Sequence, residues 1–293
     1  MAPPLCLLTV HAHPDDESSK GAGTVARYHA EGVRTVLVCC TGGEEGDILN
    51  PAMDREDVRA DIGRIRLEEL DRAAAIIGYD EVVMLGYRDS GMPESEANAR
   101  PEAFANADLD EAVGRLVAVI RRERPQVVVT YADDQQGYPH PDHLRVHDIT
   151  HPAVERAADP SWYPEDGPPW QVAKVYYSIW SKKRIELTHA KYLELGLESP
   201  FNDEWFARPW QDERITTSID IAGYGHVRLD ALLAHATQVD PNSPFWFGLP
   251  RDVSESLHPY DDYVLAWVAD EVDAPTPEDD LFAGLREQAW SGT

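Results

Sequence analysis

Apolar runs of strand length alternate with amphipathic segments along the first 160 residues. The apolar runs lie at 5–10, 34–40, 81–85 and 126–130. The segments with apolar residues at helical spacing lie at 21–31, 57–77 and 109–122. Because strands that alternate with helices are typical of parallel βαβ units, the sequence predicts a Rossmann-like α/β fold. We expect a doubly wound, mostly parallel sheet with helices on both faces.

The pattern becomes looser after about residue 160. Further strands are predicted at 172–179 and 215–219, and further helices at 183–195 and 224–235. No glycine- and serine-rich linker or internal repeat divides the chain, so we expect one domain over 1–293 with a core over 1–160. Residues 161–293 then form an elaboration that completes the substrate site. The segment 274–280, rich in Pro, Glu and Asp, is predicted to be a surface extension.

The composition narrows the classes of partner. The chain has 26 basic and 53 acidic residues, which gives a formal net charge of −27 at pH 7. Such a charge repels phosphate backbones and anionic lipids, so nucleic acid and membrane surfaces are poor candidate partners. No apolar stretch approaches the roughly 20 residues of a membrane span, and the N-terminus lacks the basic region of a signal peptide.

The number and positions of the cysteines bear on the cellular compartment. Cys6, Cys39 and Cys40 all lie within apolar, strand-like runs. An odd count with two adjacent residues does not fit a disulfide framework, so we expect buried free thiols. Together with the missing signal peptide, this favours a cytoplasmic protein.

Two dense groups of imidazole and carboxylate side chains follow predicted strands. The first reads His-Ala-His-Pro-Asp-Asp-Glu-Ser over 11–18, and the second reads Tyr-Pro-His-Pro-Asp-His over 138–143. Burying such groups without a partner is costly, and a divalent metal is a partner that suits them. Ligands of open parallel sheets bind outside the carboxyl ends of the strands. Both groups are therefore expected on one rim of the sheet, beside the polar loops 41–56, 86–106 and 132–141.

The first group supplies two candidate metal ligands. His13 and Asp16 stand close together on a tight turn that Pro14 stiffens. With His143 from the second group they give three protein ligands and an open position for water, as in a catalytic zinc site. Asp15 is then free to act as a base toward that water. The alternative is that Asp16 or Glu17 lies at a helix start as part of a capping cluster without binding a metal, but the second group of ligands disfavours it.

The second group allows more than one assignment. His143 and His147 have the spacing of a zinc-protease pair, but Leu144 stands where those proteases carry Glu. We assign His143 as a ligand and His147 to packing or a supporting contact. His140 is expected to donate toward a developing oxyanion or the leaving amine, with Asp142 holding its charge or tautomer. The alternative for His140 is a surface histidine.

These motifs resemble those of a known family. The stretches Ala-His-Pro-Asp-Asp-Glu over 12–17 and His-Pro-Asp-His over 140–143 are similar to the zinc-dependent, LmbE-like deacetylases of the N-acetylglucosaminyl-phosphatidylinositol de-N-acetylase superfamily. Within that superfamily the chain looks most similar to the mycothiol enzymes, particularly the branch of mycothiol S-conjugate amidases. The resemblance runs from about residue 5 to residue 284, and its supporting stretches lie at 17–21, 41–44, 48–51, 89–91 and 235–240.

The resemblance implies a role for each matching residue of the two motifs. His13, Asp16 and His143 would bind one zinc ion per chain, and ferrous iron also suits these ligands. Asp15 would be the general base. His140 would act as the acid or as the stabiliser of an oxyanion.

The resemblance also implies roles outside the metal ligands. Tyr138 would polarise the amide carbonyl, and Arg66 and Asp89 would hold the glucosamine-inositol part of the substrate. Lys20 matches a Ser-Ser-Lys-Gly stretch of the amidase branch and would reach the acyl-cysteine side. Without the resemblance, Arg66 and Lys20 read as solvated helix charges and Asp89 as a turn residue.

The expected function is metal-dependent hydrolysis of the amide bond of mycothiol S-conjugates. The substrate is thus a small pseudo-disaccharide thiol conjugate, and the products are glucosaminyl-inositol and an N-acetylcysteine S-conjugate, a mercapturic acid. Such a reaction serves detoxification or natural-product maturation. The sister activity, deacetylation of N-acetylglucosaminyl-inositol in mycothiol biosynthesis, is the main alternative. A non-catalytic sugar-binding α/β module is the third hypothesis, and it has no use for Asp15 beside an open metal position.

Overall fold

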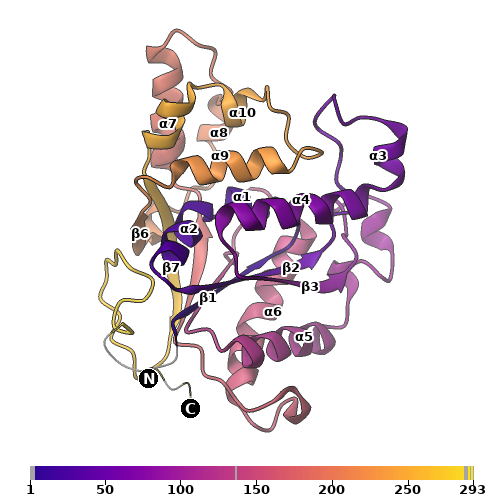
Figure 1. Ribbon diagram of the computed structural model, residues 1–293, viewed down its shortest axis with the longest axis vertical. Coiled ribbons are helices and arrows are strands. Elements are labelled where there is room, and N and C mark those ends of the chain that lie inside the picture. Colours follow the sequence, from indigo (N-terminus) through magenta and orange to yellow (C-terminus); the bar gives the residue numbers. More distant parts are fainter. Residues whose placement is uncertain (1–3, 136, 287–289, 291, 293) are drawn as a thin grey trace.

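A seven-stranded sheet forms the centre of the protein (Figure 1), whose computed structural model describes residues 4–135, 137–286, 290 and 292. Its strands are β1 (Cys6–His11), β2 (Arg34–Thr41), β3 (Glu81–Tyr87), β4 (Val127–Thr130), β5 (Lys174–Ile179), β6 (Thr217–Asp220) and β7 (Tyr260–Val268). They lie in the order β3-β2-β1-β4-β5-β7-β6. The first five are mutually parallel, and β7 runs antiparallel to both β5 and β6. The predicted α/β fold with a mostly parallel sheet is therefore confirmed.

Helices cover both faces of the sheet. Figure 1 shows α2 (Ala22–Ala30), α4 (Ile62–Ile77) and α9 (Gly225–Ala234) over one face, and α5 (Leu109–Glu123) and α6 (Pro141–Ala158) over the other. The remaining α-helices are α1 (Asp16–Ser19), α3 (Glu56–Ala60), α7 (Lys182–Glu194), α8 (Asp203–Phe206), α10 (Pro244–Phe247) and α11 (Arg251–Ser256). None of the helices in the described part of the chain is long and apolar enough to span a membrane.

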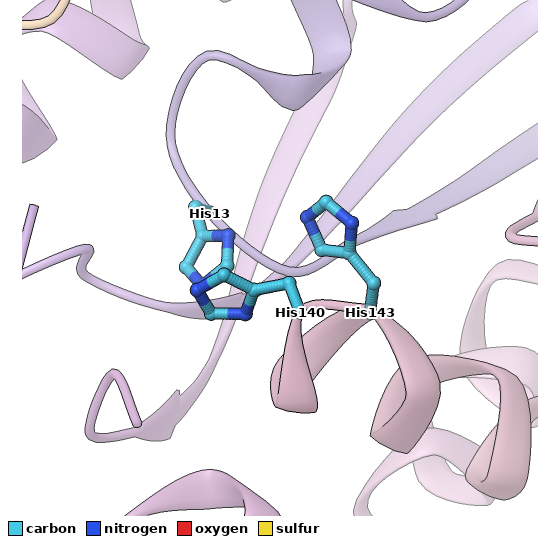
Figure 2. A group of neighbouring side chains, drawn as sticks. All are labelled: His13, His140 and His143. Atoms are coloured by element: carbon cyan, nitrogen blue, oxygen red, sulfur yellow. The ribbon is translucent and has the colours of Figure 1, made fainter. Parts of the chain in front are cut away.

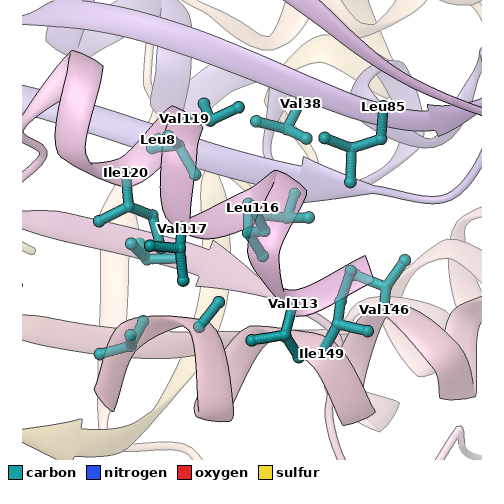
Figure 3. Close-up of a cluster of buried hydrophobic side chains, with 14 of the residues drawn as sticks. Leu8, Val38, Leu85, Val113, Leu116, Val117, Val119, Ile120, Val146 and Ile149 are labelled. Carbon is teal, nitrogen blue, oxygen red and sulfur yellow. The ribbon is translucent and has the colours of Figure 1, made fainter. Parts of the chain in front are cut away.

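The hydrophobic core has two main layers because the central strands are buried on both faces. On β4, Val128 points into the layer beneath α5 and α6, whereas Val127 and Val129 point into the layer beneath α2 and α9. Figure 3 shows the first layer, where side chains such as Leu116 and Ile149 lie against the sheet. The three cysteines are free and buried, as the sequence predicts.

One long predicted helix is two helices in the structure. The segment 57–77 is interrupted at Asp61, whose φ of −133° leaves the helical region, so that α3 ends and α4 begins there. Asp61 and Gly63 have low helix propensity, which favours an interruption at this point. The helix α4 packs against α9, whereas α3 has no comparably extensive packing, within the described residues, that would keep it in line with α4. The apolar spacing that suggested a single helix belongs to α4.

The acidic segment near the C-terminus does not lie wholly on the surface, so the predicted surface extension is wrong at Glu278. This side chain is buried and its Oε1 lies 2.5 Å from Nζ of Lys174, which is equally buried. The hydroxyl group of Tyr176 donates to Glu278 Oε2 at 2.5 Å. A buried lysine on β5 needs a carboxylate partner, and the 274–280 segment supplies it.

Candidate active site

The segments that follow the parallel strands β1, β3 and β4 bring the candidate residues together. His13 follows β1 and Asp89 follows β3, while His140 and His143 lie at the start of α6, which follows β4. Pro141 occupies the first turn of α6, a position where its missing N–H costs nothing. His140 thus becomes the N-cap of α6, and His143 lies on its first turn. Figure 2 shows the three imidazoles converging from the β1 loop and the start of α6.

A cavity of about 390 Å³ opens over this cluster. Its lining includes every site residue assigned from the sequence apart from Asp142, namely His13, Asp15, Asp16, Lys20, Arg66, Asp89, Tyr138, His140 and His143. The C-terminal part of the chain also contributes to this lining through Leu232, Gln238, Val239 and Trp246. We call this space the polar cavity because charged side chains such as Lys20, Arg66 and Asp89 line it.

Carboxylates surround the ring of His13. Its Nε2 lies 3.0 Å from Asp142 Oδ2 and 3.5 Å from Asp89 Oδ1, and its Nδ1 lies 3.4 Å from Asp16 Oδ2. Burial lowers the pKa of a histidine, but these carboxylates raise the pKa of His13 well above its ordinary value. So much negative charge in a buried place attracts a cation, which is the property required of a metal site.

Asp16 connects His13 to His143. Its Oδ2 accepts a hydrogen bond from the backbone N–H of His13 at 3.0 Å and lies 3.5 Å from His143 Nε2. Its Oδ1 lies 2.5 Å from Nζ of Lys20, one helical turn along α1. Burial opposes ionisation of Asp16, yet the Lys20 ammonium and His143 hold its pKa well below the usual range. Burial also lowers the pKa of His143 to about 4, so this imidazole is neutral, as a metal ligand must be.

The hydrogen bonds around His13 indicate which of its ring nitrogens could bind a divalent ion. Ligand atoms lie within 4.8 Å of one another in two sets, His13 with His140 and His143, and His13 with Asp89 and Asp142. Asp142 already accepts hydrogen bonds from Ser90 N at 2.9 Å and from Ser90 Oγ, and it faces His13 Nε2. A carboxylate so placed fixes one proton on Nε2, so Nδ1 is the nitrogen of His13 that can bind a metal once it has released its own proton.

The Asp142 carboxylate makes its hydrogen-bonding contacts with His13 and Ser90, and the hydrogen bond to His140 comes from the backbone N–H of Asp142, which donates to Nδ1 at 3.2 Å. The reason is geometric: His140 is the N-cap of α6, and Asp142 lies in the first turn with its side chain toward His13 and the β3 loop. Burial and His13 lower the pKa of His140, and the negative charge of Asp142 still offsets part of that fall. Since Nδ1 accepts a hydrogen bond, the neutral His140 ring carries its proton on Nε2.

Asp15 occupies a strained turn at the edge of the polar cavity. Its φ of 109° lies in the left-handed region, which non-glycine residues rarely adopt and which costs about 1–3 kcal/mol. Burial raises the pKa of Asp15, and the Arg66 guanidinium, whose Nη2 lies 3.2 Å from Oδ2, offsets part of that rise. The side chain remains 30% exposed, so solvent reaches it. A carboxylate with a raised pKa, open to the cavity, is suited to accept a proton.

Arg66 is buried, contrary to its reading as a solvated helix charge. Its guanidinium donates to the carbonyl oxygens of Gly43 at 2.5 Å and Pro14 at 2.6 Å, besides its contact with Asp15. Asp89 is also buried, and its carboxylate accepts the N–H groups of Gly91 at 2.8 Å and Glu45 at 3.2 Å. Both side chains thus organise loops of the cavity wall as well as facing the cavity.

Tyr138 and Lys20 lie where the polar cavity meets a second space. This second cavity, of about 420 Å³, shares Ser19, Lys20, Tyr138, His143 and Trp246 with the first. Burial raises the pKa of Tyr138, so its hydroxyl group remains a hydrogen-bond donor at neutral pH. Contact with Asp16 raises the pKa of Lys20 despite burial, so its ammonium stays charged.

Several supporting residues were not assigned from the sequence. His235 Nε2 lies 2.6 Å from Glu17 Oε1, and Glu17 Oε2 accepts the backbone N–H of Asp15 at 2.9 Å, which holds the strained turn. Tyr131 stacks on His143 with ring centroids 4.4 Å apart. An aromatic residue directly after the fourth predicted strand was a usable signal for Tyr131, whereas Glu17 and His235 are 218 residues apart.

The chain is similar to known metabolic enzymes over nearly its full length. Residues 8–154 match the family described as GlcNAc-PI de-N-acetylase. A mycothiol S-conjugate amidase of Streptomyces coelicolor is 45% identical, with 99% of this chain and 100% of the relative covered. A 1D-myo-inositol 2-acetamido-2-deoxy-alpha-D-glucopyranoside deacetylase of Geodermatophilus obscurus is 41% identical, with 97% of this chain and 99% of the relative covered.

Solved structures share the fold at lower identity. An N,N'-diacetylchitobiose deacetylase from Pyrococcus horikoshii aligns with a TM-score of 0.59 and 17% identity, covering 88% of this chain and 82% of that one. A 4-carboxy-2-hydroxymuconate hydratase from Pseudomonas putida aligns with the same TM-score and 18% identity, covering 92% of this chain and all of that one. Since their printed activities differ, this likeness concerns the fold alone.

Proposed function

Because the chain belongs to the GlcNAc-PI de-N-acetylase family, we propose that it is a metal-dependent amide hydrolase that acts on mycothiol S-conjugates. The scissile bond joins the glucosamine nitrogen to the acylated cysteine. Its hydrolysis releases glucosaminyl-inositol and an N-acetylcysteine S-conjugate. The proposal draws on the similarity to the amidase of Streptomyces coelicolor and on the space beside Lys20.

We assign His13, Asp16 and His143 as the residues that hold the ion. Asp16 lies outside the two sets of mutually close ligand atoms, but its Oδ2 lies 3.4 Å from His13 Nδ1 and 3.5 Å from His143 Nε2, and these two distances support the assignment. Imidazole nitrogens with a carboxylate oxygen suit zinc, and also ferrous iron. A divalent ion there would lower the pKa of a water molecule and polarise a carbonyl group.

The chain's own residues then perform the proton transfers. Asp15 accepts a proton from the attacking water, whose oxygen bonds to the acyl carbon. Tyr138 and the Nε2–H of His140 are donors toward the carbonyl oxygen as it becomes negative. The C–N bond breaks as the leaving amine takes up a proton, with His140 or protonated Asp15 as its source. Arg66 and Asp89, on the polar cavity wall, bind the glucosaminyl-inositol part.

The observation that favours the amidase over the deacetylase is the second cavity beside Lys20. An acetyl group is small and needs no such space, whereas an S-substituted N-acetylcysteinyl group does. The cavity measures about 420 Å³ and begins at residues that also line the polar cavity. Deacetylation of N-acetylglucosaminyl-inositol stays the second candidate, since the relative of Geodermatophilus obscurus carries that name at 41% identity.

The decisive experiment compares the two substrates on one zinc-reconstituted preparation. We expect kcat/KM for a mycothiol S-conjugate to exceed that for N-acetylglucosaminyl-inositol. A strong preference for the acetyl compound would overturn the amidase assignment. Hydrolysis of neither compound by zinc- or iron-loaded protein would refute the proposed function altogether.

Two substitutions separate metal binding from proton transfer. We expect His13→Ala to lose bound zinc and activity together, and Asp15→Ala to keep zinc while losing turnover. Asp71→Ala is the matched control, because Asp71 is an exposed carboxylate on α4 that lines neither the polar cavity nor the second cavity. Full activity in Asp15→Ala protein would refute the assigned base.

A further inference from the structure

We propose that the second cavity is a binding site for the S-substituent of the conjugate and that it selects aromatic and other bulky apolar groups. This inference rests on the proposed function and specifies its substrate class. The name aromatic cavity is used below for this space, whose wall carries the rings of Trp180, Trp205, Trp210, Phe245 and Trp246.

The rings of the aromatic cavity pack against one another. Trp180 stacks on Phe245 with centroids 5.9 Å apart and planes at 13°, and Trp246 meets Phe245 edge-on at 4.7 Å. Trp205 lies 5.5 Å from Phe245, and the guanidinium carbon of Arg208 lies 3.5 Å from the centroid of its ring. Side chains held in this way form a cavity before the ligand arrives, which lowers the entropic cost of binding.

The position of the aromatic cavity matches the chemistry of the proposed substrate. Lys20, Tyr138 and His143 line both cavities, so the boundary between them is the reaction centre itself. A substrate with its amide at that boundary has its amine side in one cavity and its acyl side in the other. The sulfur of an acylated cysteine is attached to the acyl side, so its substituent enters whichever cavity the sugar does not occupy.

The walls of the two cavities differ in polarity, and this decides which part of the substrate each one takes. The polar cavity presents the charged groups of Glu45, Arg66 and Asp89, which suit a hydroxyl-rich pseudo-disaccharide. Indole and phenyl rings dominate the other wall, and rings prefer offset or edge-on contact with further rings. A volume of about 420 Å³ lies within the range of roughly 300–1,000 Å³ that holds drug-sized ligands.

The test compares mycothiol conjugates that bear an S-benzyl or an S-methyl group, together with N-acetylglucosaminyl-inositol. For the unaltered enzyme we expect kcat/KM for the benzyl conjugate to exceed that for the methyl conjugate at least about tenfold, since the benzyl group buries far more apolar area. Equal values for the two conjugates would overturn the aromatic-site proposal. They would leave the proposed amidase function intact, because both conjugates would still be hydrolysed.

Two variants perturb the aromatic cavity in opposite ways. Trp205→Ala removes one wall, and Ser178→Leu adds bulk from β5 into the space that Ser178 lines. Each is expected to reduce the benzyl-to-methyl ratio by about threefold to tenfold, which corresponds to the loss of one aromatic contact. Activity toward N-acetylglucosaminyl-inositol reports whether each variant is folded and should remain near that of the unaltered enzyme.

A matched control removes an indole elsewhere. Trp162 follows α6 and is 41% exposed, and it packs on Arg156. Trp162→Ala is expected to leave the benzyl-to-methyl ratio unchanged. The site assignment would be overturned if Trp205→Ala and Ser178→Leu both left that ratio unchanged, or if Trp162→Ala changed it as much as they do. Failure to hydrolyse either conjugate, with the acetyl compound still cleaved, would instead point to failure of the proposed function.

Discussion

The carboxylate of Asp142 provides a sensitive test of how the metal site is built. It is fully buried, it lies 3.0 Å from His13 Nε2, and Ser90 holds it through its backbone N–H and its hydroxyl group. Asp142→Asn keeps the shape of the side chain but removes the charge. Because Ser90 N and His13 Nε2 both contact the same oxygen of Asp142, the amide oxygen of the Asn side chain can take that place and still accept from both. The proton on Nε2 then stays where it is, and what is lost is the negative charge that makes His13 a stronger metal ligand.

The expected effect is a weakening of metal affinity rather than loss of the fold. Removing a carboxylate behind a ligating histidine costs about 10–100-fold in metal affinity, or about 1.4–2.8 kcal/mol. We would titrate metal-free protein with zinc against a competing chelator and measure activity at saturating zinc. Ser90→Ala is the matched control, because it keeps the carboxylate and removes one of its hydrogen bonds, so its effect should be smaller. Zinc affinity unchanged in Asp142→Asn protein would refute the assigned role of the Asp142 charge behind His13.

Three further predictions concern stability, measured by urea unfolding of reduced protein. Lys174→Met should cost about 3–5 kcal/mol because it leaves Glu278 buried and unpaired, while Lys174→Met/Glu278→Leu should recover most of that loss; equal instability of both would refute the account. Burial raises the pKa of the Cys6 thiol to about 12, from an ordinary value of 9.0, so the unfolded chain ionises first. The free energy of unfolding should therefore fall as the pH rises from about 9 toward 12. Cys6 contributes about 1.4 kcal/mol per pH unit to this fall, so the fall should be shallower by that amount in Cys6→Ala protein. Asp15→Gly should be more stable than Asp15→Ala by about 1 kcal/mol because glycine relieves the strained φ; the reverse order would contradict the strain.

The strands β1, β2 and β4, which carry the clearest sequence signal, are buried on both faces. Their sequences are continuous runs rich in apolar and β-branched residues, such as Val-Val-Val-Thr in β4, without charged residues in their interior that would suggest a loop. The strand β7 was not predicted because it begins Tyr-Asp-Asp-Tyr, a pattern that suggests a surface loop. In the structure Asp261 pairs with Arg228 and accepts the N–H of Thr24, and Ser218 donates to Asp262 at 2.7 Å. These partners lie far from Asp261 and Asp262 in the sequence, so the residues around the two aspartates do not predict that their carboxylates are buried.

The same distinction between local and distant contacts holds at the site. His13, Asp15 and Asp16 stand together in the sequence, and this cluster, taken with the second group over 138–143, predicted a metal site. The partner of Asp142 could not be derived from spacing, because its contact with His13 joins residues 129 positions apart. The aromatic cavity is likewise invisible in the sequence, since its rings come from separate segments that meet only in the folded chain.

The two adjacent aspartates of the first motif illustrate how the fold assigns different roles to identical side chains. Asp16 faces Lys20 and the two histidines, and these contacts hold its pKa well below the usual range, which suits a permanent ligand. Asp15 points the other way because its residue adopts φ of 109°, and there burial raises its pKa with only partial relief from Arg66. Environments that move the pKa values of neighbouring carboxylates apart separate a base from a charged ligand. The strained turn is therefore part of the proposed chemistry: without it both carboxylates would face the same cation, and neither would remain free to accept a proton.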